Sequence, residues 1–148
     1  MATSFDVIID RAMTTMRDYK LDRIYEDNPD AFREIMSGYI AFGVTKFQGC
    51  VKPLTYDIVM QEFDEDLDMY EVNIIATLTI ISWYEDNLRD VLEFREPLRD
   101  VDFNKYSTGQ NLRPRQDYLA QLRSDVKMDI NNYQFMHMNE LPYWKDHN

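Results

Sequence analysis

The sequence predicts an all-α fold, an antiparallel bundle of about four helices with a short strand or extended segment and a C-terminal extension. Three observations lead to this class. Apolar residues recur at helical spacing, helix-start signals stand at Asn28 and Asp68, and the connections between the predicted helices are short. The 148 residues fit one domain. We expect a helical domain over residues 1–135 and a C-terminal tail over residues 136–148.

The first two predicted helices each begin at a side chain that can cap a helix. Ser4 precedes residues 5–16, whose apolar members fall on one helical face and predict about four turns. Asn28 is followed by a proline, which is favoured at the first helical position, and by an acid that faces the helix dipole. In this second helix, Gly38 and Gly43 either weaken the helix locally or let another helix approach closely.

The segment 51–66 lacks a helical pattern. Apolar residues at positions 54, 56 and 58 alternate with polar ones, which favours a short strand over residues 54–58 or an extended loop. Pro53 restricts such a strand to a sheet edge. Seven acidic residues and no Lys or Arg lie between positions 57 and 71, which is the strongest local charge bias in the chain.

A long third helix is predicted to start at Asp68. Asp68 and Glu71 have the spacing of a capping box, in which each side chain binds the backbone amide of the other residue. Residues 74–83 are apolar on most sides, so we expect this helix to be the central and most buried one. Pro97 ends it.

A polar connection leads to the last helix, and we expect Phe103 and Tyr106 to pin it. The last helix starts near Asn111, with Pro114 tolerated in its first turn. Its apolar stripe supports packing of one helix on another, although the repeat is too short to require a coiled coil. The residues that recur every seven positions are Leu112, Leu119, Val126 and Tyr133, with Leu122 and Ile130 beside them.

The chain is strongly acidic. It has 16 Lys and Arg against 27 Asp and Glu, a formal net charge of −11. Proteins that hold nucleic acid through its phosphates need clustered cations, and an anionic membrane surface repels negative charge, so both binding classes are disfavoured. DNA that only passes by is compatible with an acidic surface. With Cys50 alone, no intrachain disulfide can form. Residues 1–9 lack a secretory signal, and we expect a soluble protein made in a reducing cytoplasm, with no membrane span.

No residue pattern predicts an enzyme. The two histidines, His137 and His147, lie in the C-terminal segment, and no Gly-rich phosphate loop is present. Sequence distance does not exclude a Cys–His pair, but we interpret Cys50 as a small loop residue and His137 as a polar tip among apolar neighbours. We therefore predict no catalytic residues and no cofactor.

The acidic run does not match a calcium loop. An EF-hand needs Gly at its sixth position and a bidentate Glu at its twelfth, where this sequence has Met69 and Ile75. We predict no metal site. The run is typical of a solvated acidic loop, and the functional alternative is an electrostatic patch that meets a basic partner or faces a DNA channel. This predicted acidic patch consists of Asp64, Glu65, Asp66 and Asp68.

A dense apolar set lies near the end of the chain. All but one of its members are aromatic or Met, the types enriched in the cores of interfaces. Either the segment folds back onto its own bundle, or it binds a partner, which Pro142 and the polar residues 145–148 slightly favour. The candidate partner-binding residues are Tyr133, Phe135, Met136, Met138, Leu141, Tyr143 and Trp144.

The order of these elements resembles the neck proteins of long-tailed bacteriophages, the head–tail connectors or adaptors beneath the portal. The resemblance covers residues 4–135 and is one of pattern rather than of an invariant motif. It is carried by the capped first helix from Ser4 to Tyr19, Asn28-Pro29, the turn Phe63-Asp64-Glu65-Asp66-Leu67, then Ile81-Ser82-Trp83-Tyr84, Val91-Leu92-Glu93-Phe94, the Phe103 and Tyr106 loop, and the helix from Asn111-Leu112 to Asn132-Tyr133.

The resemblance implies a structural virion protein that forms a twelve-membered ring with itself. Such a ring docks on the portal protein, presents a platform to the next neck or tail-completion protein, and leaves a channel through which DNA passes. The C-terminal helix and tail of the family commonly contact the portal, which here points to residues 133–144. The implied location is the neck of the virion, after synthesis in the cytoplasm of the bacterial host.

Two rival hypotheses stay open. The first is an acidic helical regulatory module that binds one basic or helical protein. The second is a small enzyme that uses Cys50 or the acids of residues 64–71, and the sequence disfavours it. Self-association and binding to the portal discriminate the adaptor from the regulatory module.

Overall fold

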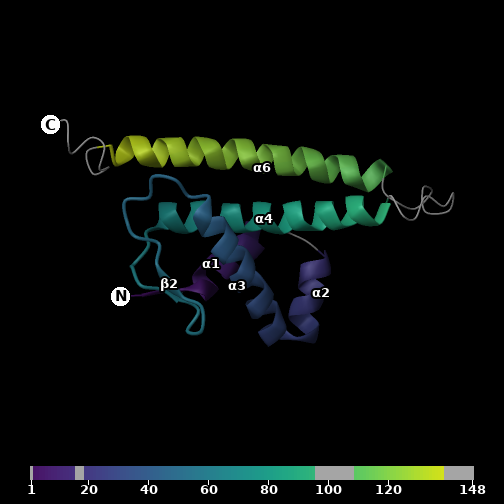
Figure 1. Cartoon of the computed structure of the whole chain (residues 1–148), viewed down its shortest axis with the longest axis horizontal. Helices are drawn as coiled ribbons and strands as arrows, with labels where there is room; N and C mark the ends of the chain where they lie inside the picture. Colours follow the sequence, from purple (N-terminus) through teal and green to yellow (C-terminus); the bar gives the residue numbers. More distant parts are fainter. Residues whose placement is uncertain (1, 16–18, 96–108, 139–148) are drawn as a thin grey trace.

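Helices make up most of the structure, a computed structural model that describes residues 2–15, 19–95 and 109–138 (Figure 1). These residues contain five helices and three strands of 2 residues each. The predicted helical bundle is confirmed, and a small antiparallel sheet accompanies it. The elements are β1 (Thr3–Ser4), α1 (Phe5–Thr15), α2 (Tyr19–Asp27), α3 (Pro29–Thr45), β2 (Tyr56–Asp57), β3 (Glu62–Phe63), α4 (Met69–Arg95) and α6 (Gly109–Met136).

The predicted caps begin α1 and α3. The Ser4 hydroxyl accepts a hydrogen bond from the Asp6 amide at 3.2 Å. The Asn28 side chain accepts one from the Ala31 amide, also at 3.2 Å, and a proline occupies the first position of α3. These bonds satisfy backbone donors that a helix start leaves without a partner, so local sequence alone fixes where both helices begin.

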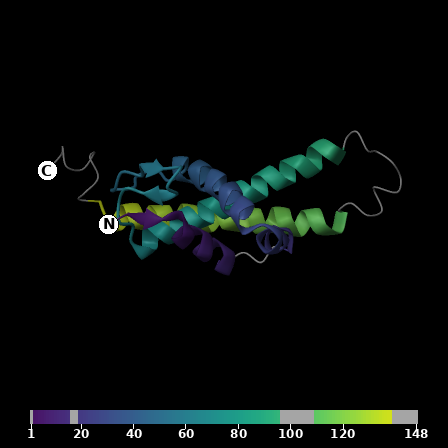
Figure 2. The ribbon, with the colours of Figure 1, turned by 90° about the horizontal axis from the view of Figure 1, so that it is seen from below.

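Helix α4 is the centre of the fold. Helices α1, α3 and α6 pack against it from different sides, as Figures 1 and 2 show together. Every apolar side chain between positions 74 and 83 is buried, which confirms the predicted central helix. At Gly43 in α3, a Cβ atom would lie 3.1 Å from the backbone nitrogen of Thr79. This glycine therefore serves the close approach of α3 to α4.

Helix α6 runs antiparallel along α4 (Figure 1). Its buried side chains are those of the predicted seven-residue stripe: Leu119, Leu122, Val126 and Tyr133, with Ile130 half-buried. The helix begins at Gly109, two residues before the predicted start, so Pro114 lies in its second turn. The burial of Leu112 and the expected pinning by Phe103 and Tyr106 lie outside the described residues.

The sheet joins the start of the chain to a hairpin. Strand β3 is in the middle, and β1 and β2 pair antiparallel with it on either side. Thr3 and Tyr56 both stand opposite Phe63. Phe63 is fully buried, and its ring lies 5.0 Å from that of Phe5 in α1. Strand β2 falls within residues 54–58 and at a sheet edge, as expected.

Helix α2 has no counterpart among the predicted elements. The expected first helix runs from Ser4 to Tyr19, whereas α1 ends at Thr15 and a separate helix, α2, begins at Tyr19. Five of its nine residues are charged, and the apolar stripe in its sequence is limited to Leu21, Ile24 and Tyr25. It is held by a few contacts, among them Ile24 against the core and the ring of Tyr25 on that of Phe32, at 5.3 Å.

Candidate functional site

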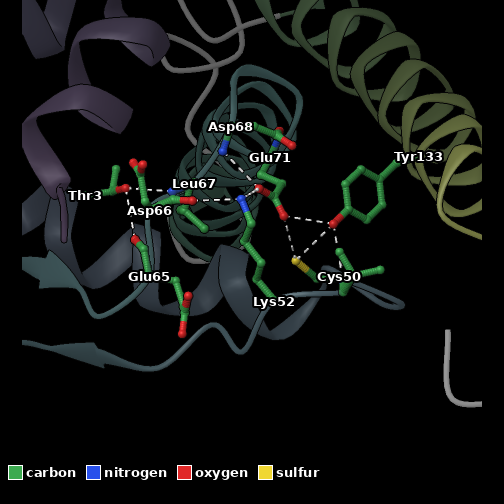
Figure 3. Close-up of polar contacts among 10 residues, drawn as sticks. Thr3, Cys50, Lys52, Glu65, Asp66, Leu67, Asp68, Glu71 and Tyr133 are labelled. Atoms are coloured by element: carbon green, nitrogen blue, oxygen red, sulfur yellow. Dashed lines mark hydrogen bonds and ion pairs between the residues drawn. The ribbon is translucent and has the colours of Figure 1, made fainter. Parts of the chain in front are cut away.

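A buried carboxylate lies where α4 begins and α6 ends (Figure 3). The Asp68 side chain accepts a hydrogen bond from the Glu71 amide at 2.9 Å, and Glu71 Oε1 accepts one from the Asp68 amide at 2.9 Å. The predicted capping box is confirmed. The Glu71 side chain is 0% exposed, so its carboxylate needs donors from other elements to offset its lost hydration.

Three neighbours supply those donors. Lys52 Nζ lies 2.8 Å from Glu71 Oε1. The Tyr133 hydroxyl, from α6, donates to Oε2 at 2.8 Å and accepts from the Val51 amide at 3.2 Å. The Cys50 thiol donates to Oε2 at 3.6 Å. Cys50, Lys52, Glu71 and Tyr133, here the Glu71 cluster, thus join one loop to the first turn of α4 and the end of α6 (Figure 3).

The pKa directions define the charge state of the Glu71 cluster. Burial alone would raise the pKa of Glu71, but hydrogen bonds from Lys52 and two further donors outweigh it and lower the pKa. The hydrogen bond to Glu71 raises the pKa of Lys52. Burial raises the pKa of both Tyr133 and Cys50. At neutral pH one carboxylate and one ammonium therefore face each other, beside a protonated phenol and a protonated thiol.

This charge state favours a structural clamp over nucleophilic chemistry. A cysteine attacks as its thiolate, and the raised pKa of Cys50 keeps the thiol protonated beside an ionised carboxylate. Glu71 has all its charge compensated by fixed donors and is closed to solvent. The Glu71 cluster holds the end of α6 against the first turn of α4.

The acidic turn before α4 is held through its backbone. The Thr3 hydroxyl donates to the Glu65 carbonyl at 3.0 Å and accepts from the Leu67 amide at 2.8 Å. Lys52 Nζ donates to the Asp66 carbonyl at 2.7 Å. Figure 3 shows this turn beside the Glu71 cluster. Because main-chain atoms make these contacts, the carboxylates of Asp64 and Asp66 are left at the surface, whereas the Leu67 side chain is buried.

The structure divides the predicted acidic patch into two roles. Asp64 and Asp66 are exposed and Glu65 is half-buried. The carboxylate of Asp68 caps α4, although the residue as a whole is exposed. Sequence reasoning missed Lys52, which ties the turn to Glu71. The sequence does distinguish Lys52, because it is the only Lys or Arg between Lys46 and Arg89 and the acidic run follows it.

The β2–β3 hairpin presents an apolar tip that the sequence did not predict as a surface. The Asp57 carboxylate accepts from the amides of Val59 and Met60 at 2.9 and 3.1 Å, and Gln61 adopts a φ of 53°. These local bonds tighten the turn, and its side chains point to solvent. Val59 is 86% exposed.

The tip belongs to a larger exposed apolar set, here the end surface. Its residues lie on β2 and the hairpin tip, on the first turn of α4 and on the last turn of α6. In Figure 1, β2 and the hairpin lie below the start of α4 and α6 lies above it, so the set is spread over three segments of the fold. The end surface consists of Tyr56, Ile58, Val59, Met60, Met69, Tyr70 and Met136.

The predicted partner-binding residues differ in how far they are exposed to solvent. Tyr133 is 0% exposed, so its assignment to a partner is wrong: Glu71 gives its hydroxyl a buried acceptor, and the edge of its ring meets Phe47 at 5.2 Å. Phe135 and Met136 are exposed, and Met138 is half-buried. The remaining candidates, Leu141, Tyr143 and Trp144, lie outside the described residues.

No group of three or more His, Cys, Asp or Glu side chains among the described residues is arranged to hold a metal ion. No helix in the described part of the chain combines the length and apolar character that a membrane span requires. Comparison of the chain with known protein families, with curated proteins and with solved structures gave no match.

Proposed function

We propose that this chain is a structural head–tail connector, or adaptor, of the neck of a long-tailed bacteriophage. In this role it assembles with itself as a ring, docks on the portal protein, and receives the next neck or tail-completion protein. The ring encloses a channel for DNA passage, and the protein is made in the cytoplasm of the bacterial host. The sequence resemblance suggests the role.

The observation that carries the proposal is the end surface. Exposed apolar side chains that gather on a surface mark contacts with other proteins, and the hairpin tip gathers three of them, Ile58, Val59 and Met60. Here Val59 and Met69 are 86% and 68% exposed. The capping box and the Glu71 cluster hold the first turn of α4 and the end of α6, and the two hydrogen bonds to the Asp57 carboxylate hold the hairpin tip, so the surface is presented by fixed elements.

Charge supports the same role. Asp64 and Asp66 are exposed beside the end surface, and the chain carries a net charge of −11. Repeated around a ring, this charge repels DNA phosphates, so DNA passes without being held. Weak contacts repeated around the ring become a strong joint because each bound subunit raises the effective concentration of the next.

The test uses DNA-filled heads of a phage that lacks this protein. We expect the purified chain to co-sediment with heads that carry the portal ring. Val59→Asp places a charge in the end surface and should abolish co-sedimentation. Val7→Asp is the matched control, because Val7 is an exposed valine on α1 that is not part of the end surface. Failure of the unaltered chain to bind heads contradicts the function, and equal binding by Val59→Asp contradicts the end surface.

The exposed acids Asp64 and Asp66 also favour a second candidate, an acidic helical module that binds a basic protein. Salt separates the two candidates, because charge-based binding weakens strongly between low and high ionic strength whereas apolar docking does not. A chain that stays monomeric, ignores heads and binds a basic peptide would support this module.

A further inference from the structure

Helix α3 exposes a second apolar face, opposite the one it buries. Ile35 and Phe42 lie on this outer face and are 41% and 67% exposed. Gly38 lies between them, at the spacing of three and four residues that places side chains along one side of a helix. The outer face of α3 thus has two large apolar side chains with a gap between them.

The fold of the single chain does not explain Gly38. Among the described residues, nothing lies within 4 Å of the position where its Cβ would be. A glycine inside a helix costs about 1 kcal/mol relative to alanine, and Gly43 in the same helix offsets that cost by its close contact with α4. Gly38 has no such contact among the described residues, and the notch that it leaves fits a side chain from outside the protomer.

Helix α6 carries the same pattern on its outer face. Met128 and Phe135 are 61% and 75% exposed, and the exposed Asn131 lies between them. Their spacing of three and then four residues repeats that of Ile35, Gly38 and Phe42 in α3. In both helices the two large apolar side chains are therefore seven residues apart, which is two turns.

We propose that the outer face of α3 in one copy of this chain docks against the outer face of α6 in a second copy. Met128 of the second copy fills the notch at Gly38, between Ile35 and Phe42, as a ridge enters a groove between packed helices. This inference names the faces that join neighbouring subunits, and it rests on the proposed ring.

One pair of charges beside the two faces is complementary, while the exposed Asp125 lies on the other side of the outer face of α6. Glu34 is exposed next to the outer face of α3, and Lys127 is exposed next to that of α6. Among the described residues neither of them forms an ion pair within the chain. Because the two docking faces are different, each copy keeps one face open for the next, and the contact propagates until a ring closes.

Disulfide trapping tests this contact in the full chain, with Cys50→Ser as background. Two cysteines are introduced, by Gly38→Cys and Met128→Cys. Mild oxidation should give a ladder of dimers, trimers and larger species on a non-reducing gel. A contact between two helices buries less area than a stable interface needs, so the copies meet only briefly. A disulfide makes each such encounter permanent, and cross-linked species accumulate. Thermal unfolding checks that each variant is folded, and Gly38 has space for the added side chain.

Three controls make the outcome decisive. Gly38→Cys alone and Met128→Cys alone should give no trimer, and a strong dimer from either would overturn the proposal in favour of a symmetric contact between like faces. Gly38→Cys with Glu26→Cys, an exposed position on α2, should give no ladder. Adding Phe42→Ser to the two-cysteine variant should abolish the ladder. If the variant with only Gly38→Cys and Met128→Cys gives no ladder, the proposed faces are overturned. A ladder from a chain that ignores phage heads would uphold these faces and contradict the neck function.

Discussion

Replacing Tyr133 by Phe tests the Glu71 cluster with the removal of one oxygen atom. The hydroxyl donates to the ionised carboxylate of Glu71 at 2.8 Å and accepts from the Val51 amide at 3.2 Å, and both bonds are lost. A hydrogen bond to a charged group contributes about 1.5–3 kcal/mol, and a neutral one about 1 kcal/mol. We expect the free energy of unfolding to fall by about 3 kcal/mol. For a chain of this size the thermal midpoint then drops by roughly 6–12 °C.

The assay is urea unfolding followed by circular dichroism. The midpoint should fall while the slope stays unchanged, because the variant buries the same surface. Tyr118→Phe is the matched control: it lies on the same helix, its ring contacts that of Tyr84 at 5.4 Å, and its hydroxyl forms no hydrogen bond within the described residues. A loss below about 0.5 kcal/mol, the usual effect of a surface change, would refute the reasoning, as would an equal loss in the control.

Three more outcomes are expected. The pKa of Glu71 is lower in the folded than in the unfolded chain, so ionised Glu71 stabilises the fold above about pH 4.3. This contribution is lost as pH falls through the folded pKa, and the thermal midpoint should fall with it. In Glu71→Gln the thermal midpoint should depend less on pH in this acidic range. Gly43→Ala should destabilise by about 1–3 kcal/mol because its Cβ meets the α4 backbone, whereas Gly38→Ala should stabilise by about 0.5–1 kcal/mol, both measured by urea unfolding. Deletion of residues 136–148 should leave helical circular dichroism nearly intact, because Tyr133 stays, but should abolish sedimentation with heads; loss of folding would instead show that the tail belongs to the core.

Local signals in the sequence were sufficient for most of the bundle. Asn28 and the Asp68–Glu71 pair each satisfy backbone donors within three residues, so their role needs no knowledge of the rest of the fold. The apolar run of α4 and the stripe of α6 likewise depend on helical periodicity alone. Helix α2 does have helical periodicity, with Leu21, Ile24 and Tyr25 at the spacing of one helical face, but it has only nine residues and follows the first helix closely, so this short signal was not separated from that helix.

The candidate site depended on contacts between distant parts of the chain, and there sequence reasoning failed in part. Tyr133 was a member of the seven-residue stripe, which correctly places it inside, and also of the aromatic C-terminal set, which wrongly assigns it to a partner. The choice depends on Glu71, a buried acceptor 62 positions away. The exposed hairpin tip was missed for a similar reason, since its orientation follows from pairing β3 with β1.

The bond between Glu71 and Tyr133 also has a kinetic consequence. It closes a loop of 62 residues, so the chain must lose much conformational freedom before this bond can form. We expect it to form after the folding barrier has been crossed. Interactions that form after the barrier slow unfolding without speeding folding. We therefore expect this bond to lengthen the lifetime of the folded subunit and to leave its folding rate unchanged.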